Sequence, residues 1–234
     1  MRIGVIGAGG MGETLARHLA RLGHHVAIAN SRGPESLTGL AAQIGATAVS
    51  VVEAVNGGEI VILAIPTKAV PDLPRTLFAN RPSRVVIIDV ANYHPELRDG
   101  RIDAIDRGML DSEWVAHQIG RPVIKAFNNI VANSLATRGV PAGTPGRICL
   151  SVAGDDLRAK AKVIRLIDTL GFDAIDAGAL ADSWRQQPGT PAYCRDLDIN
   201  GLKAALAKAD ASQIATYRAQ ADEAARAYFA SRPL

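Results

Sequence analysis

Short apolar runs rich in valine and isoleucine alternate along the chain with segments in which hydrophobic residues recur every three or four positions. The runs predict β-strands, and the spaced segments predict amphipathic helices. Strands that alternate with helices are typical of parallel βαβ units, so the predicted fold class is α/β with a doubly wound, mostly parallel sheet. The predicted strands of this sheet are residues 3–6, 26–29, 47–52, 60–65, 85–90 and 123–127.

The second part of the chain continues the pattern and then loses it. Strands are predicted at 148–153 and 172–175, with a helix between them, and two further helices near the C-terminus. Between residues 179 and 198 no periodicity is visible, and a long irregular segment of this kind is often functional. We expect a larger domain of residues 1–145 and a small C-terminal domain of residues 146–234, α/β or helical, that carries this segment as a loop at the site.

Composition excludes several classes of protein. The 234 residues are 48% hydrophobic and 21% charged, which is typical of a soluble globular chain. The net charge of +3 is scattered and aromatic residues make up only 4%, so nucleic acid is not an expected partner. The two cysteines are far apart in the sequence and read as reduced thiols. No signal peptide or membrane span is recognised, and the expected location is cytoplasmic.

A glycine-rich turn follows the first predicted strand and opens the first predicted helix. The hexapeptide Gly7, Ala8, Gly9, Gly10, Met11, Gly12 fits the pattern G-x-G-x-x-G. In the dinucleotide-binding fingerprint the first glycine allows a tight turn, the second admits a pyrophosphate, and the third lets the helix pack on the strand. Because pattern and context agree, we predict a Rossmann-type domain that binds a dinucleotide at this turn.

The residues at the end of the second predicted strand indicate which dinucleotide is bound. NAD-binding proteins usually place an acidic residue here to bind the ribose hydroxyls. This chain has Asn30, Ser31 and Arg32 instead, and a hydroxyl with a guanidinium favours the 2′-phosphate of NADP(H). The alternative is that Arg32 forms a surface ion pair with Glu35.

Further polar residues follow the fourth, fifth and sixth predicted strands, where open α/β sheets bind ligands. Pro66, after Ile65, is expected to form a wall beside the ribose, and Asn92 is expected in the same cofactor site. No catalytic residue is assigned, and the candidates are His94, as a proton donor, and Asn128. The alternative for His94 is that it faces solvent while Asn92 caps a turn. Asn128 either lines a pocket or satisfies backbone groups of its loop.

Other catalytic signatures are not recognised. The five histidines have no metal-ligand spacing, and neither a nucleophile elbow nor a phosphate-transfer loop is found. Hydride transfer by a bound cofactor needs few protein groups, which favours an oxidoreductase. Two alternatives stay open. One is an imine, carbonyl or ferric reductase, for which Tyr93, His94 or Tyr193 would have to face the nicotinamide, and the other is an NADP(H)-binding sensor without catalysis.

Five segments recur in the order known for one family. They are residues 1–12, 30–32, 125–128, 152–156 and 171–173. With them the chain resembles the coenzyme F420-dependent NADP oxidoreductases, in particular a bacterial branch often labelled only as dinucleotide-binding. The resemblance implies a Rossmann domain for NADP, a small C-terminal domain that helps to bury a deazaflavin, and hydride transfer between the nicotinamide and the deazaflavin. It also suggests a homodimer.

The resemblance further implies roles for single residues. Gly9, Gly10 and Met11 would touch the pyrophosphate, Ser31 and Arg32 would hold the 2′-phosphate, Ile65 and Pro66 would flank the ribose and nicotinamide, and Asn128 and Ile130 would lie beside the acceptor. Archaeal members have a lysine at Ser36 and a histidine at Asn128. These departures leave acceptors other than F420 open, including a flavin.

Overall fold

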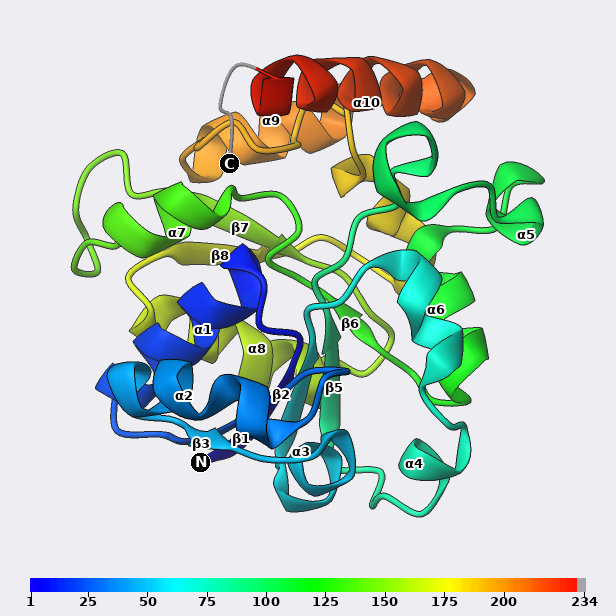
Figure 1. Cartoon of the computed structure of the whole chain (residues 1–234). Helices are drawn as coiled ribbons and strands as arrows, with labels where there is room; N and C mark the ends of the chain where they lie inside the picture. Colours follow the sequence, from blue (N-terminus) through cyan, green and yellow to red (C-terminus); the bar gives the residue numbers. More distant parts are fainter. Residues whose placement is uncertain (231–234) are drawn as a thin grey trace.

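The computed structural model describes residues 1–230 of the chain. A sheet of six parallel strands forms its centre, in the order β3-β2-β1-β4-β5-β6 (Figure 1). The strands are β1 (Arg2–Ile6), β2 (His25–Ala29), β3 (Thr47–Ala48), β4 (Ile60–Leu63), β5 (Val86–Asp89) and β6 (Ile124–Lys125). This order and the parallel pairing are those of a doubly wound α/β sheet, so the predicted fold class is confirmed.

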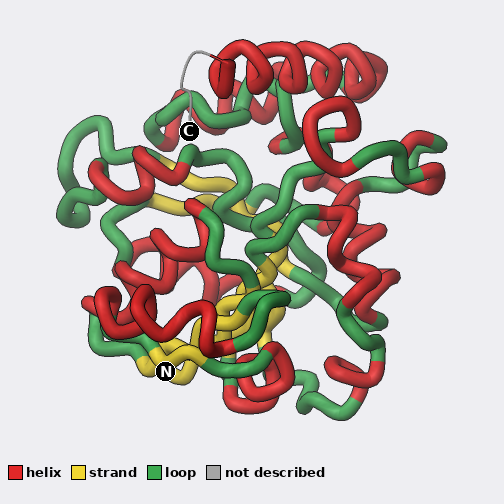
Figure 2. Tube along the Cα trace, in the orientation of Figure 1, coloured by secondary structure: helices red, strands yellow, loops and turns green. Residues whose placement is uncertain are grey.

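Helices cover both faces of the sheet, and Figure 2 shows them in red around the yellow strands. One face packs against α1 (Gly10–Arg21), α2 (Thr38–Ile44) and α8 (Leu157–Thr169). The other face packs mainly against α3 (Val51–Gly57), α4 (Thr76–Ala79) and α6 (Asp111–Ile119). The remaining short helices that bear on the site are η1 (Pro34–Leu37), η2 (Thr67–Asp72), η3 (Pro95–Asp99), α5 (Asp103–Asp106) and α7 (Ala132–Thr137).

The strand residues divide between the two faces with a period of two. In β4, Ile60 and Ile62 belong to the hydrophobic cluster under α1 and α8, whereas Val61 and Leu63 belong to the cluster on the opposite face. All four are buried, as expected for a strand between two helical layers. The continuous apolar run in the sequence is therefore explained by burial on both sides.

The second part of the chain adds a small parallel pair, β7 (Cys149–Val152) and β8 (Asp173–Asp176), joined by α8. Lys125 of β6 forms an antiparallel bridge with Ala153, which connects this pair to the large sheet. The Arg147 guanidinium is buried and lies 2.7 Å from Asp168 and 2.8 Å from Asp173, so it ties the start of β7 to β8. Because α8 packs into the core shared with β1, the two parts have continuous hydrophobic packing. The boundary at residue 145 stays a prediction.

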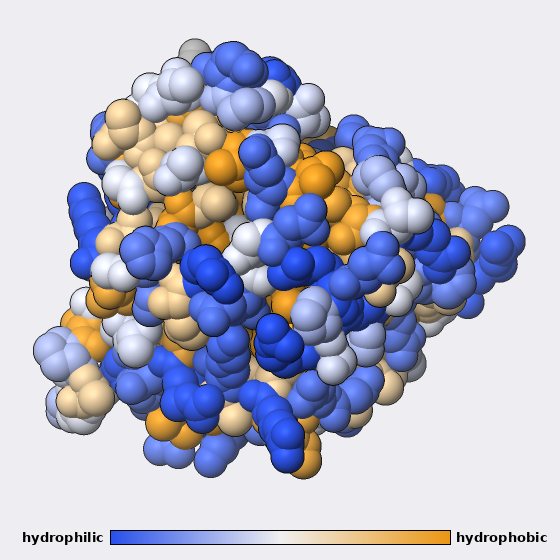
Figure 3. Space-filling view, turned by 90° about the horizontal axis from the view of Figure 1, so that it is seen from below, coloured by the Kyte–Doolittle hydropathy of each residue, from blue (hydrophilic) through white to orange (hydrophobic). Residues whose placement is uncertain are grey.

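Two helices complete the described chain, α9 (Ile199–Lys208) and α10 (Ile214–Ala230). They lie beyond the carboxyl ends of the strands, at the top of Figure 1. The opposite end of the molecule, seen in Figure 3, is mostly hydrophilic with separate hydrophobic patches. No helix within residues 1–230 combines the length and the apolar character that a membrane crossing needs.

The structure corrects two predicted strands. Residues 47–52 were expected to be one strand, but β3 ends at Ala48 and α3 begins at Val51. Ser50 accepts a hydrogen bond from the Glu53 N–H and the Glu53 carboxylate accepts one from the Ser50 N–H, a capping box that starts the helix despite its two valines. The strand expected at 123–127 is paired only over Ile124–Lys125.

The aperiodic segment is largely irregular, as predicted. It contains one 3₁₀ helix, η4 (Leu180–Gln186), followed by turns up to the start of α9. Ser183, Gln186, Gln187 and Thr190 are all buried, so the middle of this segment is part of the interior, whereas its two ends are exposed.

Candidate functional site

The loops after five strands meet at the carboxyl edge of the large sheet. The strand order changes direction between β1 and β4, because the chain continues from β1 to β2 on one side and returns to β4 on the other. In open α/β sheets the crevice at such a point is where ligands bind. Of the predicted site residues, this edge brings together the glycine turn after β1 and the loops after β2, β4, β5 and β6.

Gly7 and Gly12 are required by close packing of the glycine turn. Gly7 has φ +109°, and a Cβ atom on it would lie 2.2 Å from the Ala64 carbonyl oxygen. A Cβ atom on Gly12 would lie 2.1 Å from the Gly7 carbonyl oxygen. Both distances are impossible for carbon, so neither position accepts a side chain. The turn therefore has the geometry predicted for the first and third glycines of the fingerprint.

Gly9 and Gly10 are exposed, and their surroundings differ from those of the other two glycines. A Cβ atom on Gly9 would meet no described atom within 4 Å, and one on Gly10 would lie 3.8 Å from the Ala132 side chain at the start of α7. Gly9 is the N-cap of α1, and within residues 1–230 no side chain caps this helix end. The first N–H groups of α1 thus point toward open space with the positive end of the helix dipole, an arrangement that suits an anion.

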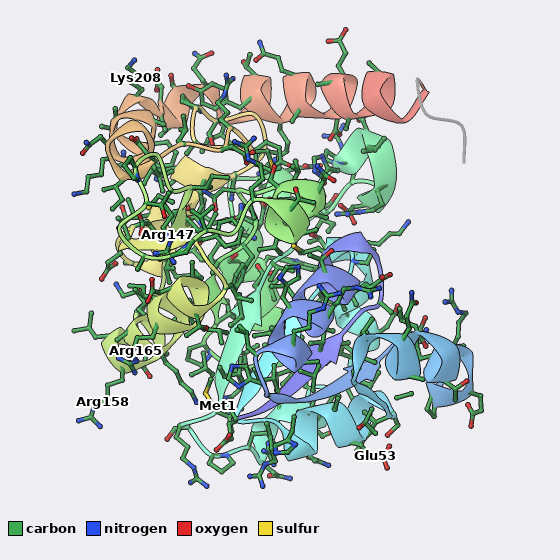
Figure 4. All side chains as sticks on the ribbon, turned by 90° about the vertical axis from the view of Figure 1, so that its left-hand side faces the viewer. Met1, Glu53, Arg147, Arg158, Arg165 and Lys208 are labelled. Carbon is green, nitrogen blue, oxygen red and sulfur yellow. The ribbon has the colours of Figure 1, made fainter. Side chains whose placement is uncertain are left out.

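Ser31 and Arg32 are both exposed after β2. Arg32 forms no ion pair within 4.0 Å with any described residue, so the alternative pairing with Glu35 is not formed. The Arg32 side chain is therefore exposed to solvent. Figure 4 shows Arg158 and Arg165 extending outward from α8.

The loops after β4 and β5 contact each other. Ile65 and Pro66 are half-buried after β4. The neighbouring Thr67 hydroxyl donates to the Asn92 carbonyl oxygen over 3.3 Å, and the Arg98 Nη2 donates to the same oxygen over 2.5 Å. Asn92 is therefore fixed by its backbone beside the loop that carries Pro66.

Three side-chain amides connect the loops after β5 and β6 with η4. The Asn128 Nδ2 group donates to Asn92 Oδ1 over 3.1 Å and to the Gln186 carbonyl oxygen over 2.7 Å. Asn92 Nδ2 donates to the Asn128 carbonyl oxygen over 3.0 Å, and Gln186 Nε2 donates to Asn128 Oδ1 over 2.8 Å. Each amide is thus held in one orientation. Sequence reasoning missed Gln186, whose only signal was its place in the aperiodic segment.

The predicted acceptor residues lie inside the protein. Asn128 and Ile130 are each only 2% exposed, and Ile130 belongs to the large hydrophobic cluster. Phe127, directly before Asn128, is buried with φ +62°, a left-handed conformation that is rare for a bulky residue. Such strained positions gather at functional sites, where the surrounding structure holds them.

His94 is buried and belongs to a chain of polar contacts, so the alternative in which it faces solvent is wrong. Its Nδ1 atom lies 2.7 Å from the Asp222 carboxylate of α10, and its Nε2 atom lies 3.5 Å from the Tyr193 hydroxyl. Burial raises the pKa of Tyr193 well above its ordinary value. Asp222 also accepts a hydrogen bond from the Glu96 N–H over 2.8 Å. This contact to α10 spans 128 residues of sequence and carried no local signal.

The Tyr93 hydroxyl is hydrogen-bonded to the segment of α5. It donates to Asp106 over 3.1 Å and accepts from the Ile102 N–H over 2.8 Å. Burial raises its pKa to about 12. The Arg218 guanidinium of α10 lies 5.0 Å from the centre of the Tyr93 ring and also pairs with Asp111 over 3.1 Å. Tyr93 is therefore an anchor for α10.

A buried ion pair joins β5 and β6 near the carboxyl edge of the large sheet. Lys125 of β6 lies 3.0 Å from the carboxylate of Asp89 of β5, and both side chains are 1% exposed. The Lys125 ammonium also donates to the Ala91 carbonyl oxygen, and Ser112 donates to Asp89 over 2.6 Å. The pair fixes the chain where it leaves β5 toward Asn92.

The two cysteines are free, and no disulfide joins them. Burial raises the pKa of Cys149 to about 12 and that of Cys194 to about 12. Both therefore carry protonated, weakly reactive thiols at neutral pH.

Comparison with known proteins identifies the family. Residues 2–93, which include the glycine turn and the loops after β2 and β4, match the family model described as NADP oxidoreductase, coenzyme F420-dependent. Over 76 residues the chain is 46% identical to the protein YjhV of Escherichia coli (strain K12), covering 32% of this chain and 48% of YjhV. Over 183 residues it is 27% identical to the metalloreductase STEAP3 of Rattus norvegicus, covering 78% of this chain and 35% of STEAP3. The chain spans about half the length of the first of these relatives and about a third of the second.

Solved structures share the fold over most of the chain. The hypothetical protein SMa0349 from Sinorhizobium meliloti is 32% identical with a TM-score of 0.72, and the match covers 84% of this chain and 95% of that one. A candidate F420-dependent NADP-reductase from Arthrobacter sp. FB24 is 24% identical with a TM-score of 0.63, and the match covers 77% of this chain and 86% of that one. The second likeness concerns the fold alone. Through residues 2–93, which contain the glycine turn, this chain belongs to the family of coenzyme F420-dependent NADP oxidoreductases.

Proposed function

We propose that this protein binds NADPH at the carboxyl edge of the large sheet and transfers a hydride between NADP(H) and a planar acceptor, with coenzyme F420 or a flavin as the first candidates. The observation that carries the proposal is the pairing of an uncapped helix N-terminus at Gly9 with the exposed Ser31 and Arg32 on the neighbouring loop. The helix N-terminus suits a diphosphate, and Ser31 with Arg32 suits the extra phosphate of NADP.

The residues present fit this cofactor. Open space above Gly9 and Gly10 allows the diphosphate to approach the first N–H groups of α1, while Ala8 and Met11 hold the turn against the core. Ser31 and Arg32 would hold the 2′-phosphate, and Ile65, Pro66 and Asn92 would border the ribose and nicotinamide. When bound, NADPH supplies the hydride, so the protein's task is to orient the two rings and to exclude water.

The acceptor would lie on the side of the β5 and β6 loops. The amides of Asn92, Asn128 and Gln186 join these loops to η4, which gives that side a fixed polar frame. The family description favours F420. Because this chain has Asn128 where archaeal members have a histidine, a flavin is the other planar acceptor that we propose. Because Asn128 and Ile130 are buried, contact with either acceptor needs a local movement of their loop. A cytoplasmic location and a homodimer are part of the same proposal.

Turnover of NADPH with a panel of acceptors tests this function. Purified protein is mixed with NADPH and, in separate reactions, with F420, FMN, a ferric chelate or a cyclic imine, and the nicotinamide absorbance is followed. We expect oxidation with F420 or FMN. Oxidation with the imine alone or the ferric chelate alone would contradict the planar acceptor, and no oxidation with any of them would favour a non-catalytic NADP(H) sensor.

Reduction of an imine or carbonyl is a second candidate, and one observation favours it. The contacts from Asp222 through His94 to Tyr193 form a chain that could deliver a proton to a substrate nitrogen or oxygen. If the imine is the acceptor, Tyr193→Phe should abolish its reduction and leave NADPH binding unchanged. A ferric acceptor, suggested by the name of STEAP3, needs no such proton donor.

A further inference from the structure

α10 is held to the rest of the protein mainly by polar contacts. Of residues 214–227, only Ala221 and Asp222 are buried, and none belongs to a hydrophobic cluster. The helices α1, α8 and α9, in contrast, each contribute buried residues to such a cluster. Most of the stability of a helix in a folded protein comes from packing of its apolar face. α10 therefore has less to fix it in place than these other helices.

A cavity lies under part of α10. It has a volume of about 250 Å³ and lies between α10 on one side and η3 with α5 on the other, with Ala215 and Ala219 in its wall. These small side chains do not fill the space, so α10 is not closely packed against η3 at this point. Segments with few buried apolar contacts are those that open locally while the rest of a protein stays folded.

Asp222 is the central polar contact of α10. Its carboxylate lies 2.7 Å from His94 Nδ1 and accepts a hydrogen bond from the Glu96 N–H over 2.8 Å. One turn further along the helix, the Arg226 guanidinium donates to the Glu96 carbonyl oxygen over 3.0 Å. Both side chains join α10 to the start of η3, directly after the loop that follows β5. These contacts can break and form again without disturbing a hydrophobic core.

α10 also covers the largely buried segment of residues 183–190. The Arg218 Nη2 group donates to Gln187 Oε1 over 3.4 Å. Gly189 has φ +81°, and a Cβ atom on it would overlap the Tyr217 carbonyl oxygen, so the α10 backbone lies directly against this glycine. The segment therefore stays covered as long as α10 stays in place.

The covered segment contains polar atoms that lack partners. Within residues 1–230, Ser183 Oγ, Gln186 Oε1, Gln187 Nε2 and Arg218 Nε are buried without a hydrogen bond. A buried polar atom without a partner costs free energy, so in a native structure it calls for an explanation. Opening of α10 would give these atoms access to water or to a bound molecule. Gln186 is also the residue whose amide holds Asn128.

We infer that α10 is a lid over the acceptor side: Asp222 holds it on the loop after β5, and its opening uncovers residues 183–190. With the lid in place, Asn128 and Ile130 are buried. The inference thus identifies the movement that contact with an acceptor requires, and in this role it rests on the proposed function. The opening itself is a property of the free protein.

Amide hydrogen exchange of the nucleotide-free wild-type protein tests the opening. We expect amides of α10 to exchange at least about 100-fold faster than those of β4, because a lid opens without unfolding of the core. Low concentrations of urea should accelerate exchange in β4 but not in α10, since opening exposes little buried surface. Equal rates in α10 and β4, with the same dependence on urea, would overturn the inference.

Asp222→Ala removes the central contact, and Glu223→Ala, at the exposed next position, is the matched control. In Asp222→Ala we expect exchange of α10 and of residues 183–190 to rise together, roughly tenfold, as for the loss of a charged hydrogen bond. This coupling distinguishes a lid from a terminal helix that only frays. Faster exchange in α10 without any change in residues 183–190, or equal effects in the control, would overturn the inference. Should Asp222→Ala fail to fold, Arg226→Ala takes its place, with an expected rise of roughly threefold in both segments.

Kinetics with the acceptor separate this inference from the proposed function. Because only the open form admits the acceptor, a roughly tenfold larger open fraction in Asp222→Ala should lower the acceptor KM by up to about tenfold. The Kd of NADPH should stay within about twofold, since the contacts of Asp222 lie outside the glycine turn and the loop after β2. If the wild type reduces no acceptor of the panel, the proposed function fails, and the exchange data still decide whether α10 opens. An unchanged KM despite faster exchange would show that the lid does not govern acceptor entry.

Discussion

At the scale of single residues, Gly12 and Gly9 of the glycine turn are needed for different reasons. Gly12 has no room for a side chain, because a Cβ atom would lie 2.1 Å from a backbone oxygen of the same turn. Gly9 has ample room, with extended backbone at φ −77° and ψ 179° that any residue adopts. Gly12 is therefore explained by folding. Gly9 has no such explanation within the described residues, and this supports the proposed approach of a ligand at Gly9.

This difference predicts opposite effects of two substitutions. Gly9→Val should leave the free energy of unfolding nearly unchanged and abolish nucleotide binding, because the side chain would fill the approach to the first N–H groups of α1. Gly12→Ala should lower the free energy of unfolding by about 2–3 kcal/mol, the cost of overpacking against a backbone atom. Urea denaturation measures the free energy of unfolding of both variants, and calorimetric titration with NADPH measures their nucleotide binding.

Gly23→Ala is the control for a glycine outside the site, since it has φ +79° and open surroundings after α1. It should reduce stability slightly and leave binding intact. Full nucleotide binding by Gly9→Val would show that the turn does not hold the diphosphate.

At the scale of elements, the adjacent ends of β5 and β6 are joined by the buried pair of Asp89 and Lys125. Neither charge reaches water, and each has additional partners, Ser112 for Asp89 and the Ala91 carbonyl oxygen for Lys125. A buried pair of this kind contributes little net stability compared with apolar residues, but it is costly to break from one side. Because Asp89 lies three residues before Asn92, the pair supports the carboxyl edge of the sheet at the proposed nucleotide site.

Lys125→Met should therefore lower the free energy of unfolding by about 3–5 kcal/mol at neutral pH, because Asp89 is left as an unpaired buried charge. The double variant Lys125→Met with Asp89→Asn should recover most of this loss. Chemical denaturation of both variants measures the effect, and Lys208→Met, at an exposed position in α9, is the matched control. A double variant no more stable than the single one would disprove the ion-pair explanation.

The elements that could be predicted from the sequence are those with a local signal. The buried strand β4 was visible as an apolar run, and α1 was visible because Leu15 and Leu19 recur on one helical face. The start of α3 was misjudged because Val51 and Val52 favour a strand, and the capping box of Ser50 and Glu53 outweighed that preference. Local capping chemistry, not hydrophobic pattern, decided this boundary.

The same limit applies to the site. The glycine turn and Arg32 are contiguous in sequence with the strands that position them, so they could be found by pattern. Gln186 and Asp222 reach their partners across 58 and 128 residues, and nothing near either residue in the sequence indicates the contact. Side chains that complete a site from a distant element become visible only in the folded chain.

At the scale of the whole molecule, the last described helix, α10, packs against loops at the carboxyl edge of the large sheet. Asp222, Arg218 and Arg226 of α10 contact, respectively, His94, Asp111 and the Glu96 backbone, so α10 is tied to the loop after β5 and to α6 (Figure 1). Together with the amides that join Asn128 to η4, these contacts build the proposed acceptor side from both parts of the chain. The glycine turn and the loop after β2, in contrast, belong to the N-terminal part alone.

In the proposed function, nucleotide binding and acceptor binding are therefore separate, and nucleotide binding is the central claim. Calorimetric titration of the wild-type protein and of Arg32→Ala with NADPH and with NADH tests it most directly, with Arg158→Ala on the outer side of α8 as control. We expect the wild type to bind NADPH at least about tenfold more tightly than NADH, and Arg32→Ala to lose roughly 10–100-fold for NADPH alone, as for a charge-assisted hydrogen bond. Equal losses for both nucleotides, or no heat of binding with either at millimolar concentration, would contradict the account.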